Sequence, residues 1–282
     1  MATAARANIT TIASFPEHFF PENLAVRADG SILVTVLNQK QLWYVPAPGG
    51  GQPATPILMH TFDHLAMGIV ETEPDVFYVS TVNEATLQRF DLRGWVPGAP
   101  VRPTPVLTFD QAAGLNGSCL VSPGVILLAD SLAGLIWRVD LADDGLTTTS
   151  SVWLQHPTMA SDPDNGFTSP IGPQPGINGI RYAARTNVVY YTSSAQKLFM
   201  RVSVDPAAHT PVGEPDVVAS DIGADDFCLD ENAAVAYLTT HTANTIVRVP
   251  INAGTDVAAT SVVAGDPFNE QLVGPSSAAW AR

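Results

Sequence analysis

Residues 116–140, NGSCLVSPGVILLADSLAGLIWRVD, hold three short apolar runs separated by turns that carry Ser, Pro, Gly and Asp. Short runs rich in Val, Ile and Leu between turn residues are typical of β-strands. Similar phrases occupy residues 22–46, 67–91, 178–205 and 225–250, and a shorter match, SSAAWAR, begins at Ser276. One more apolar run, such as PILMHTF or TPVLTF, separates successive copies. Each complete unit therefore predicts four strands.

The spacing of these repeats predicts the fold. They start at positions 22, 67, 116, 178, 225 and 276. Four-stranded repeats of roughly 40 to 50 residues are the signature of a β-propeller. We therefore expect one all-β domain over residues 1–282, a six-bladed propeller with four strands in each blade. The last repeat ends after its inner strand, so we expect the N-terminal strand around residues 9–14 to close an incomplete sixth blade.

The interval before Asn178 is longer than the others because it contains an insertion, HPTMASDPDNGFTSPIGPQPG at residues 156–176. Long loops without their own secondary structure are uncommon in compact domains and often cover a functional site. We predict a lid, with a solvated decoration as the alternative.

Composition excludes several classes of function. The chain has 13 Lys and Arg against 27 Asp and Glu, a net charge of −14. Binding to nucleic acid or to an anionic membrane surface needs a basic face, which this composition does not supply. No apolar run approaches the roughly 18 residues that span a bilayer, and the N-terminus lacks the apolar stretch of a secretory signal. We expect a soluble, cytoplasmic protein whose partners are small-molecule substrates; the sequence does not indicate an oligomeric state.

The repeat starts carry the candidate site. In a propeller the inner strands of all blades begin at the same end of the central channel, so residues far apart in sequence meet there. Four of the six starts bear a carboxylate or an amide: Glu22, Asn116, Asn178 and Asp225. Carboxylate and amide oxygens without thiolate or imidazole suit a hard cation such as Ca²⁺ or Mg²⁺. The alternative for any one of them is a turn cap that bonds backbone amides.

The same residues carry a resemblance. PEN at residues 21–23, NG at 116–117, NG at 178–179 and the phrase at Asp225 resemble the family of senescence marker protein (regucalcin) and gluconolactonase. The resemblance implies that Glu22, Asn116, Asn178 and Asp225 hold one divalent cation, with no organic cofactor. Asp226 departs from the family, which usually has Gly there, and this adds a carboxylate that could bind the cation, act as an acid or simply perturb the site.

Two longer phrases, PEHFFPENLAVRADGSILVT and VGPSSAAWAR, look most similar to a fungal branch of this superfamily that belongs to secondary-metabolite pathways. That branch includes hetero-Diels–Alderases, which join a tropolone-derived quinone methide to a humulene-type sesquiterpene alkene. The resemblance therefore implies a pericyclase of terpenoid biosynthesis. Two alternatives stay open: a divalent-metal-dependent lactonase or esterase, and a propeller without catalytic activity that binds a protein partner.

Further residues are predicted on the same face of the propeller. As catalytic acids or bases we expect Asp226, His64 and His241, because histidine titrates near neutral pH. The turns after second strands supply polar candidates for substrate binding, and nearby apolar residues supply a lining. The predicted substrate-binding residues are Phe20, Met67, Asn83, Asp130, Met159, Phe167 and Ser193. Solvated turns and local packing are the alternatives for all of them.

Overall fold

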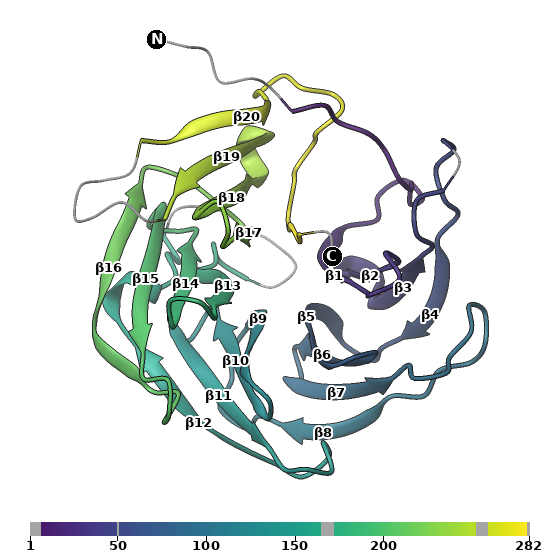
Figure 1. Ribbon diagram of the computed structural model, residues 1–282, viewed down its shortest axis with the longest axis horizontal. Helices are drawn as coiled ribbons and strands as arrows, with labels where there is room; N and C mark the ends of the chain where they lie inside the picture. Colours follow the sequence, from purple (N-terminus) through teal and green to yellow (C-terminus); the bar gives the residue numbers. More distant parts are fainter. Residues whose placement is uncertain (1–6, 50, 165–171, 252–258, 281–282) are drawn as a thin grey trace.

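The computed structural model describes residues 7–49, 51–164, 172–251 and 259–280. Its strands form five four-stranded antiparallel sheets arranged as blades around a central axis (Figure 1). Blade one is β1 (Pro21–Val26), β2 (Ile32–Val36), β3 (Gln41–Val45) and β4 (Ile57–Thr61); blade two is β5 (Leu65–Glu73), β6 (Val76–Val82), β7 (Thr86–Asp91) and β8 (Thr104–Thr108). Blade three is β9 (Leu115–Ser122), β10 (Val125–Asp130), β11 (Leu135–Leu141) and β12 (Thr148–Gln155); blade four is β13 (Ile177–Ala183), β14 (Val188–Ser193), β15 (Leu198–Val204) and β16 (Pro211–Ser220). Blade five is β17 (Phe227–Asp230), β18 (Val235–Thr240), β19 (Thr245–Pro250) and β20 (Ser261–Gly265).

Within every blade the strands follow chain order from the axis outward, and each strand pairs with the next. The five inner strands begin at or close to the predicted repeat starts. The second strands of blades two, three and four are almost continuously buried, since both faces of a blade pack against neighbours. The periodic pattern read from the sequence therefore corresponds to one blade per repeat.

Apolar side chains fill the spaces between successive blades. One cluster joins blades two and three around Met67, Tyr78 and Leu128, and equivalent clusters join the other neighbouring blades. Near the axis the inner strands approach closely. A Cβ on Gly117 would lie 2.6 Å from the backbone oxygen of Asn178, so the glycine after Asn116 is required for blades three and four to meet.

The prediction of six blades is wrong: the described residues form five. The last repeat start, Ser276, lies between blades five and one, but residues 266–280 contain no strand. Its inner strand has no second strand with which to pair, and a strand without a ladder leaves its backbone groups unsatisfied. The described N-terminal residues 7–20 likewise form no strand beyond the isolated bridge at Ala13, so the predicted N-terminal closure of a sixth blade is also wrong.

The sector between blades five and one is instead occupied by the two ends of the described chain (Figure 1). On the outside, the backbone nitrogen of Ala7 donates to the oxygen of Val263, 2.7 Å away, and Ala13 forms a parallel bridge with Ala54. Nearby aromatic side chains of this N-terminal segment, Phe15 and Phe19, cover an apolar face of blade one. Closer to the axis runs the C-terminal stretch.

Two further features limit the chemistry. Cys119 and Cys228 are both buried free thiols, and burial raises the pKa of Cys119 to about 12 and that of Cys228 to about 11. Neither is a reactive thiolate at neutral pH. Among the described residues, no helix has the length and apolar character needed to cross a membrane.

Candidate functional site

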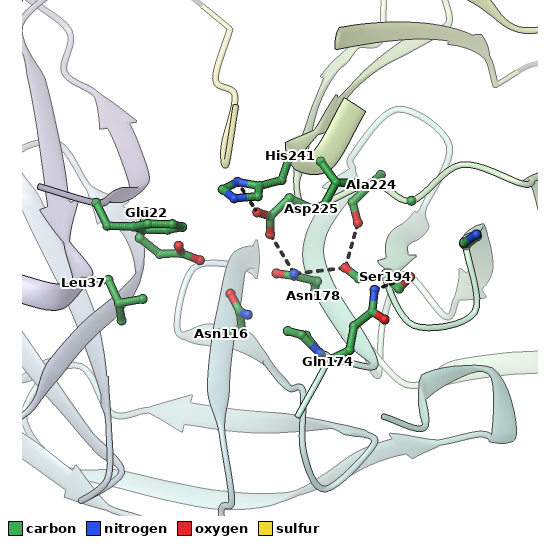
Figure 2. A pocket seen from close by; sticks show the side chains of 14 residues that line it. Glu22, Leu37, Asn116, Gln174, Asn178, Ser194, Ala224, Asp225 and His241 are labelled. Carbon is green, nitrogen blue, oxygen red and sulfur yellow. Dashed lines mark hydrogen bonds and ion pairs between the residues drawn. The ribbon is translucent and has the colours of Figure 1, made fainter. Parts of the chain in front are cut away.

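A cavity of about 180 Å³ opens at one end of the axis and receives side chains from four blades (Figure 2). Glu22 comes from blade one, Asn116 from blade three, Asn178 from blade four and Asp225 from blade five. Figure 2 shows their side chains directed toward a common space. The structure thus brings all four predicted cation ligands to one pocket, and their role as ligands stays a prediction.

Irregular strand pairing directs these residues to the axis. The register between β1 and β2 shifts between Pro21 and Asn23, so Glu22 lies in the irregularity. Register shifts also fall across Asn116 in blade three and Asn178 in blade four. A bulge leaves a residue out of the ladder and re-aims its side chain. Glu22, Asn116 and Asn178 therefore point into the cavity, whereas Asp225 precedes the regular pairing of β17 and accepts a hydrogen bond from Asn178.

Hydrogen bonds fix the orientation of the Asn178 amide. Its Nδ2 donates to Asp225 Oδ1 at 2.7 Å and to Ser194 Oγ at 3.1 Å. The Ser194 hydroxyl in turn donates to the backbone oxygen of Ala224, 2.7 Å away. Since both amide hydrogens are engaged, Asn178 Oδ1 is the atom left to face the cavity (Figure 2).

Two other oxygens of the site lack partners. Asn116 Oδ1 is buried and accepts no hydrogen bond. The Glu22 side chain, in a residue only 6% exposed, has no hydrogen bond or ion pair within the described part of the chain. Buried polar atoms without a partner are rare in folded proteins, and a bound ion is one explanation for Asn116 Oδ1.

The two carboxylates of the cavity are held in an unfavourable environment. Burial, reinforced by the charges of Asp225 and Asp226, raises the pKa of Glu22 well above its ordinary value. Burial, and then the charge of Asp226, raises the pKa of Asp225 to about 7, while the hydrogen bond from Asn178 opposes the increase. A bound cation would relieve both desolvation and repulsion.

These observations test whether a divalent cation fits. Within the described ranges, no three His, Cys, Asp or Glu side chains form a metal-binding group. The candidate set differs from such a group because it combines two carboxylates with two amides. Its unpartnered oxygens and uncompensated carboxylates match the oxygen ligands that Ca²⁺ and Mg²⁺ prefer. The donor set therefore fits a hard cation.

His241 and Phe20 form one wall of the cavity. Their rings lie 5.5 Å apart between centroids, and His241 Nδ1 lies 3.8 Å from Asp225 Oδ2. Burial lowers the pKa of His241, so the imidazole is neutral at pH 7 and this contact is not an ion pair there. His241 Nδ1 is buried and has no hydrogen-bond partner, which leaves it available as a proton acceptor.

The other two predicted catalytic residues lie outside the lining. Asp226 Oδ2 accepts from Arg181 at 2.6 Å and from Ser277 Oγ at 2.6 Å, so this carboxylate is engaged by a cation and a hydroxyl. His64 Nε2 is 2.9 Å from Glu84 in the turn between β6 and β7. The cavity lining includes His241 and neither of these two.

Most predicted substrate-binding residues also lie elsewhere. Asp130 is fully buried and accepts from the amides of residues 113, 114 and 133 and from the indole nitrogen of Trp137, so it stabilises its own turn. Met67 and Met159 are fully buried in the packing between blades. Asn83 is an exposed turn residue with φ 77°, Ser193 is fully buried, and neither lines the cavity. Phe167 lies outside the described residues.

Several lining residues were missed by the sequence reasoning. Leu37, Thr242 and Lys197 line the cavity from turns after second strands, which is the same location that suggested His241. Gln174 and Pro175 bring the end of the 156–176 insertion to the cavity. At its other end, Met159 is buried between blades. Whether the insertion acts as a lid stays a prediction.

No protein-family profile matches this sequence, and no curated protein matches it. The fold is similar to solved structures. The calcium-binding protein regucalcin of Agrobacterium tumefaciens aligns over 100% of this chain and 84% of its own at 14% identity, with a TM-score of 0.68. The periplasmic gluconolactonase of Pseudomonas aeruginosa aligns over 88% and 72% at 11% identity, with a TM-score of 0.59. A chain of a nidogen/laminin complex aligns over 89% of this chain and 82% of its own at 15% identity, with a TM-score of 0.62. At these identities the likeness concerns the fold alone.

Proposed function

We propose that this chain is a divalent-cation-dependent hydrolase of small cyclic esters, a lactonase. One observation carries the proposal: oxygen side chains from four blades converge on one cavity in which the buried Asn116 Oδ1 lacks a partner, and among the described residues neither Glu22 nor Asp225 forms an ion pair with Lys or Arg. Among proteins of similar fold, one is called calcium-binding and another a gluconolactonase. Those names support the direction of the proposal.

The protein's own residues would divide the work of ester hydrolysis. Glu22, Asn116, Asn178 and Asp225 would hold the cation, which when bound polarises an ester carbonyl and makes water more acidic. His241, neutral at pH 7, would accept the proton of the attacking water at Nδ1. Phe20 and Leu37 would shield the ester from bulk water, and the bond between Asn178 and Ser194 would keep the amide oriented.

We place lactone hydrolysis ahead of the cycloaddition implied by the fungal resemblance. The cavity of about 180 Å³ is smaller than the roughly 300–1,000 Å³ of typical ligand sites. A cycloaddition between a quinone methide and a sesquiterpene needs room for two bulky reactants held face to face. Two buried carboxylates at the base of the cavity also favour a reaction that uses a cation. No observation on the site favours protein-partner binding.

The test is an activity screen on metal-stripped protein. γ- and δ-lactones would be followed by the release of acid, with Ca²⁺, Mg²⁺, Mn²⁺ or Zn²⁺ added back separately. We expect ring opening that chelation abolishes and one of these cations restores. Cycloaddition of a hydroxymethyl-tropolone precursor with a humulene-type alkene is measured in parallel. Acceleration of that reaction by chelated protein, without lactone hydrolysis, would overturn the proposal in favour of a pericyclase.

A further inference from the structure

The C-terminal segment, defined here as residues 275–280, occupies the place of a sixth inner strand. In blades one and four a buried threonine of the second strand donates to the start of the next blade: Thr35 Oγ1 to the oxygen of Met67 and Thr192 Oγ1 to that of Asp225, both at 2.7 Å. In blade five the equivalent Thr239 donates to the oxygen of Ser276 at 3.2 Å. Ser276 therefore occupies the position of a repeat start, although the described residues 276–280 form no strand.

Two neighbouring serines of this segment reach the two strands that carry the cavity carboxylates. Ser276 Oγ donates to the backbone oxygen of Pro21 at 2.7 Å, one residue before Glu22. Ser277 Oγ donates to Asp226 Oδ2 at 2.6 Å, one residue after Asp225. The same dipeptide thus contacts blade one and blade five. The C-terminal stretch that contains it runs between these two blades (Figure 1).

Asp226 is a buried anchor point for the C-terminal segment. It is 2% exposed, and its Oδ2 is shared by Ser277 and Arg181, whose guanidinium also donates to the oxygen of Ala278 at 3.3 Å. A Cβ on Gly179 would lie 2.2 Å from Asp226 Oδ1, so the glycine at this position makes room for the carboxylate. The departure from the resembling family at position 226 therefore has a structural role, which is anchoring the chain end.

Further along the segment, Trp280 stacks on Tyr237 of β18, with ring centroids 5.7 Å apart and planes 16° apart. This contact is with blade five alone. The described contacts between the segment and blade one come from the two serines, Ser276 to Pro21 and Ser277 to Asn23 Oδ1 at 3.5 Å. Ser276 and Ser277 are therefore the residues through which the segment contacts both blade one and blade five.

Blades one and five need such a connection because no four-stranded blade lies between them. Their residues Glu22 and Asp225 are carboxylates that repel each other, so nothing in their own chemistry holds them together without a cation. We propose that Ser276 and Ser277 are positioning residues that set the separation of Glu22 and Asp225 for cation binding. This inference rests on the proposed function, since it assigns the serines a role in the same site.

The experiment compares the double variant S276A/S277A with a matched control, S150A/S151A, which removes two adjacent exposed hydroxyls from β12. Calorimetric titration of metal-stripped protein with the cation that binds best measures the dissociation constant. Loss of groups that orient metal ligands typically weakens binding by 10- to 100-fold. We expect S276A/S277A to bind at least about tenfold more weakly, S277T to retain most of the affinity, and the control to match the unmodified protein.

Hydrogen–deuterium exchange of the cation-free proteins supplies a second readout that needs neither a cation nor activity. We expect S276A/S277A to lose protection in residues 21–24 and 225–228 together, with the other blades unchanged. If the unmodified protein binds no cation, the proposed function fails. If, in addition, S276A/S277A loses protection in only one of the two segments, or in neither, the positioning role fails as well. If the unmodified protein binds a cation and the double variant binds it equally, the inference fails and the proposed function stands.

Discussion

Replacing Asp225 by Asn should make the cation-free protein more stable, and increasingly so as the pH rises. Burial and the charge of Asp226 raise the pKa of Asp225 from 3.8 to about 7. The folded state therefore holds a proton that the unfolded state has already released between these pH values. Stability is lost as the pH rises through this window, because ionisation is more costly in the folded protein. Asparagine does not ionise, so the variant escapes the loss.

The size of the effect follows from the same values. A shift from 3.8 to about 7 corresponds to roughly 4 kcal/mol when the group is fully ionised. From linkage, the free energy of unfolding of D225N should exceed that of the unmodified protein by about 1 kcal/mol near pH 4.5 and by about 4 kcal/mol near pH 8. The side chain of Asp225 is 15% exposed, so solvent screening reduces these figures only modestly. The new Oδ1 can still accept the hydrogen bond from Asn178.

Urea unfolding of metal-stripped protein at the two pH values measures the gain, and a saturating divalent cation should stabilise the unmodified protein but not D225N. D144N serves as the control. Asp144 is an exposed turn residue whose pKa is lowered by hydrogen bonds from the amides of residues 146 and 147, so its replacement should have the opposite sign. Equal or lower stability of D225N near pH 8 would refute the view that the site is destabilised by an uncompensated carboxylate.

Two further predictions separate the cavity from its surroundings. Removing Asp130 by D130A should lower the free energy of unfolding by about 3 kcal/mol, because it leaves four donors without their acceptor, two of them in buried hydrogen bonds and two in part-buried ones. Urea unfolding and cation titration check this together, and a loss of cation affinity without a loss of stability would contradict it. H241N should lower kcat for lactone hydrolysis about 100-fold with little change in KM, and it should remove one limb of the pH profile. The control H64N should behave like the unmodified enzyme in the same assay. Equal effects of the two substitutions would show that His241 is not the proton acceptor.

The repeated strands and the convergence of four polar repeat starts could be predicted because both follow from periodicity. The inner strands of successive blades begin at the same end of the axis, independently of the conformation of the loops. Glu22, Asn116, Asn178 and Asp225 therefore share a cavity. The blade count could not be obtained in this way. A repeat start marks where an inner strand would lie, as Ser276 does, but a blade also requires second and third strands.

The side chains in turns could not be assigned from sequence, because a short polar side chain can bond its own loop or face the cavity. Asp130 finds three backbone amides and an indole within reach and turns inward, while His241, in the corresponding turn of blade five, faces the site. Apolar residues are equally ambiguous: Phe20 lines the cavity, whereas Met67 fills the space between blades. Hydrogen bonds within the turn decide the orientation of Asp130, and packing between blades decides that of Met67. Neither is visible in the sequence of one repeat.

The central claim, that the four-blade cavity holds a divalent cation, is tested most directly by anomalous diffraction from a crystal soaked in Mn²⁺, which takes the oxygen ligands of Ca²⁺ and Mg²⁺. We predict a single strong anomalous peak in contact with Glu22, Asn116, Asn178 and Asp225, absent from crystals of D225N grown and soaked in the same way. No peak in the cavity, or a peak only at surface carboxylates, would contradict the claim.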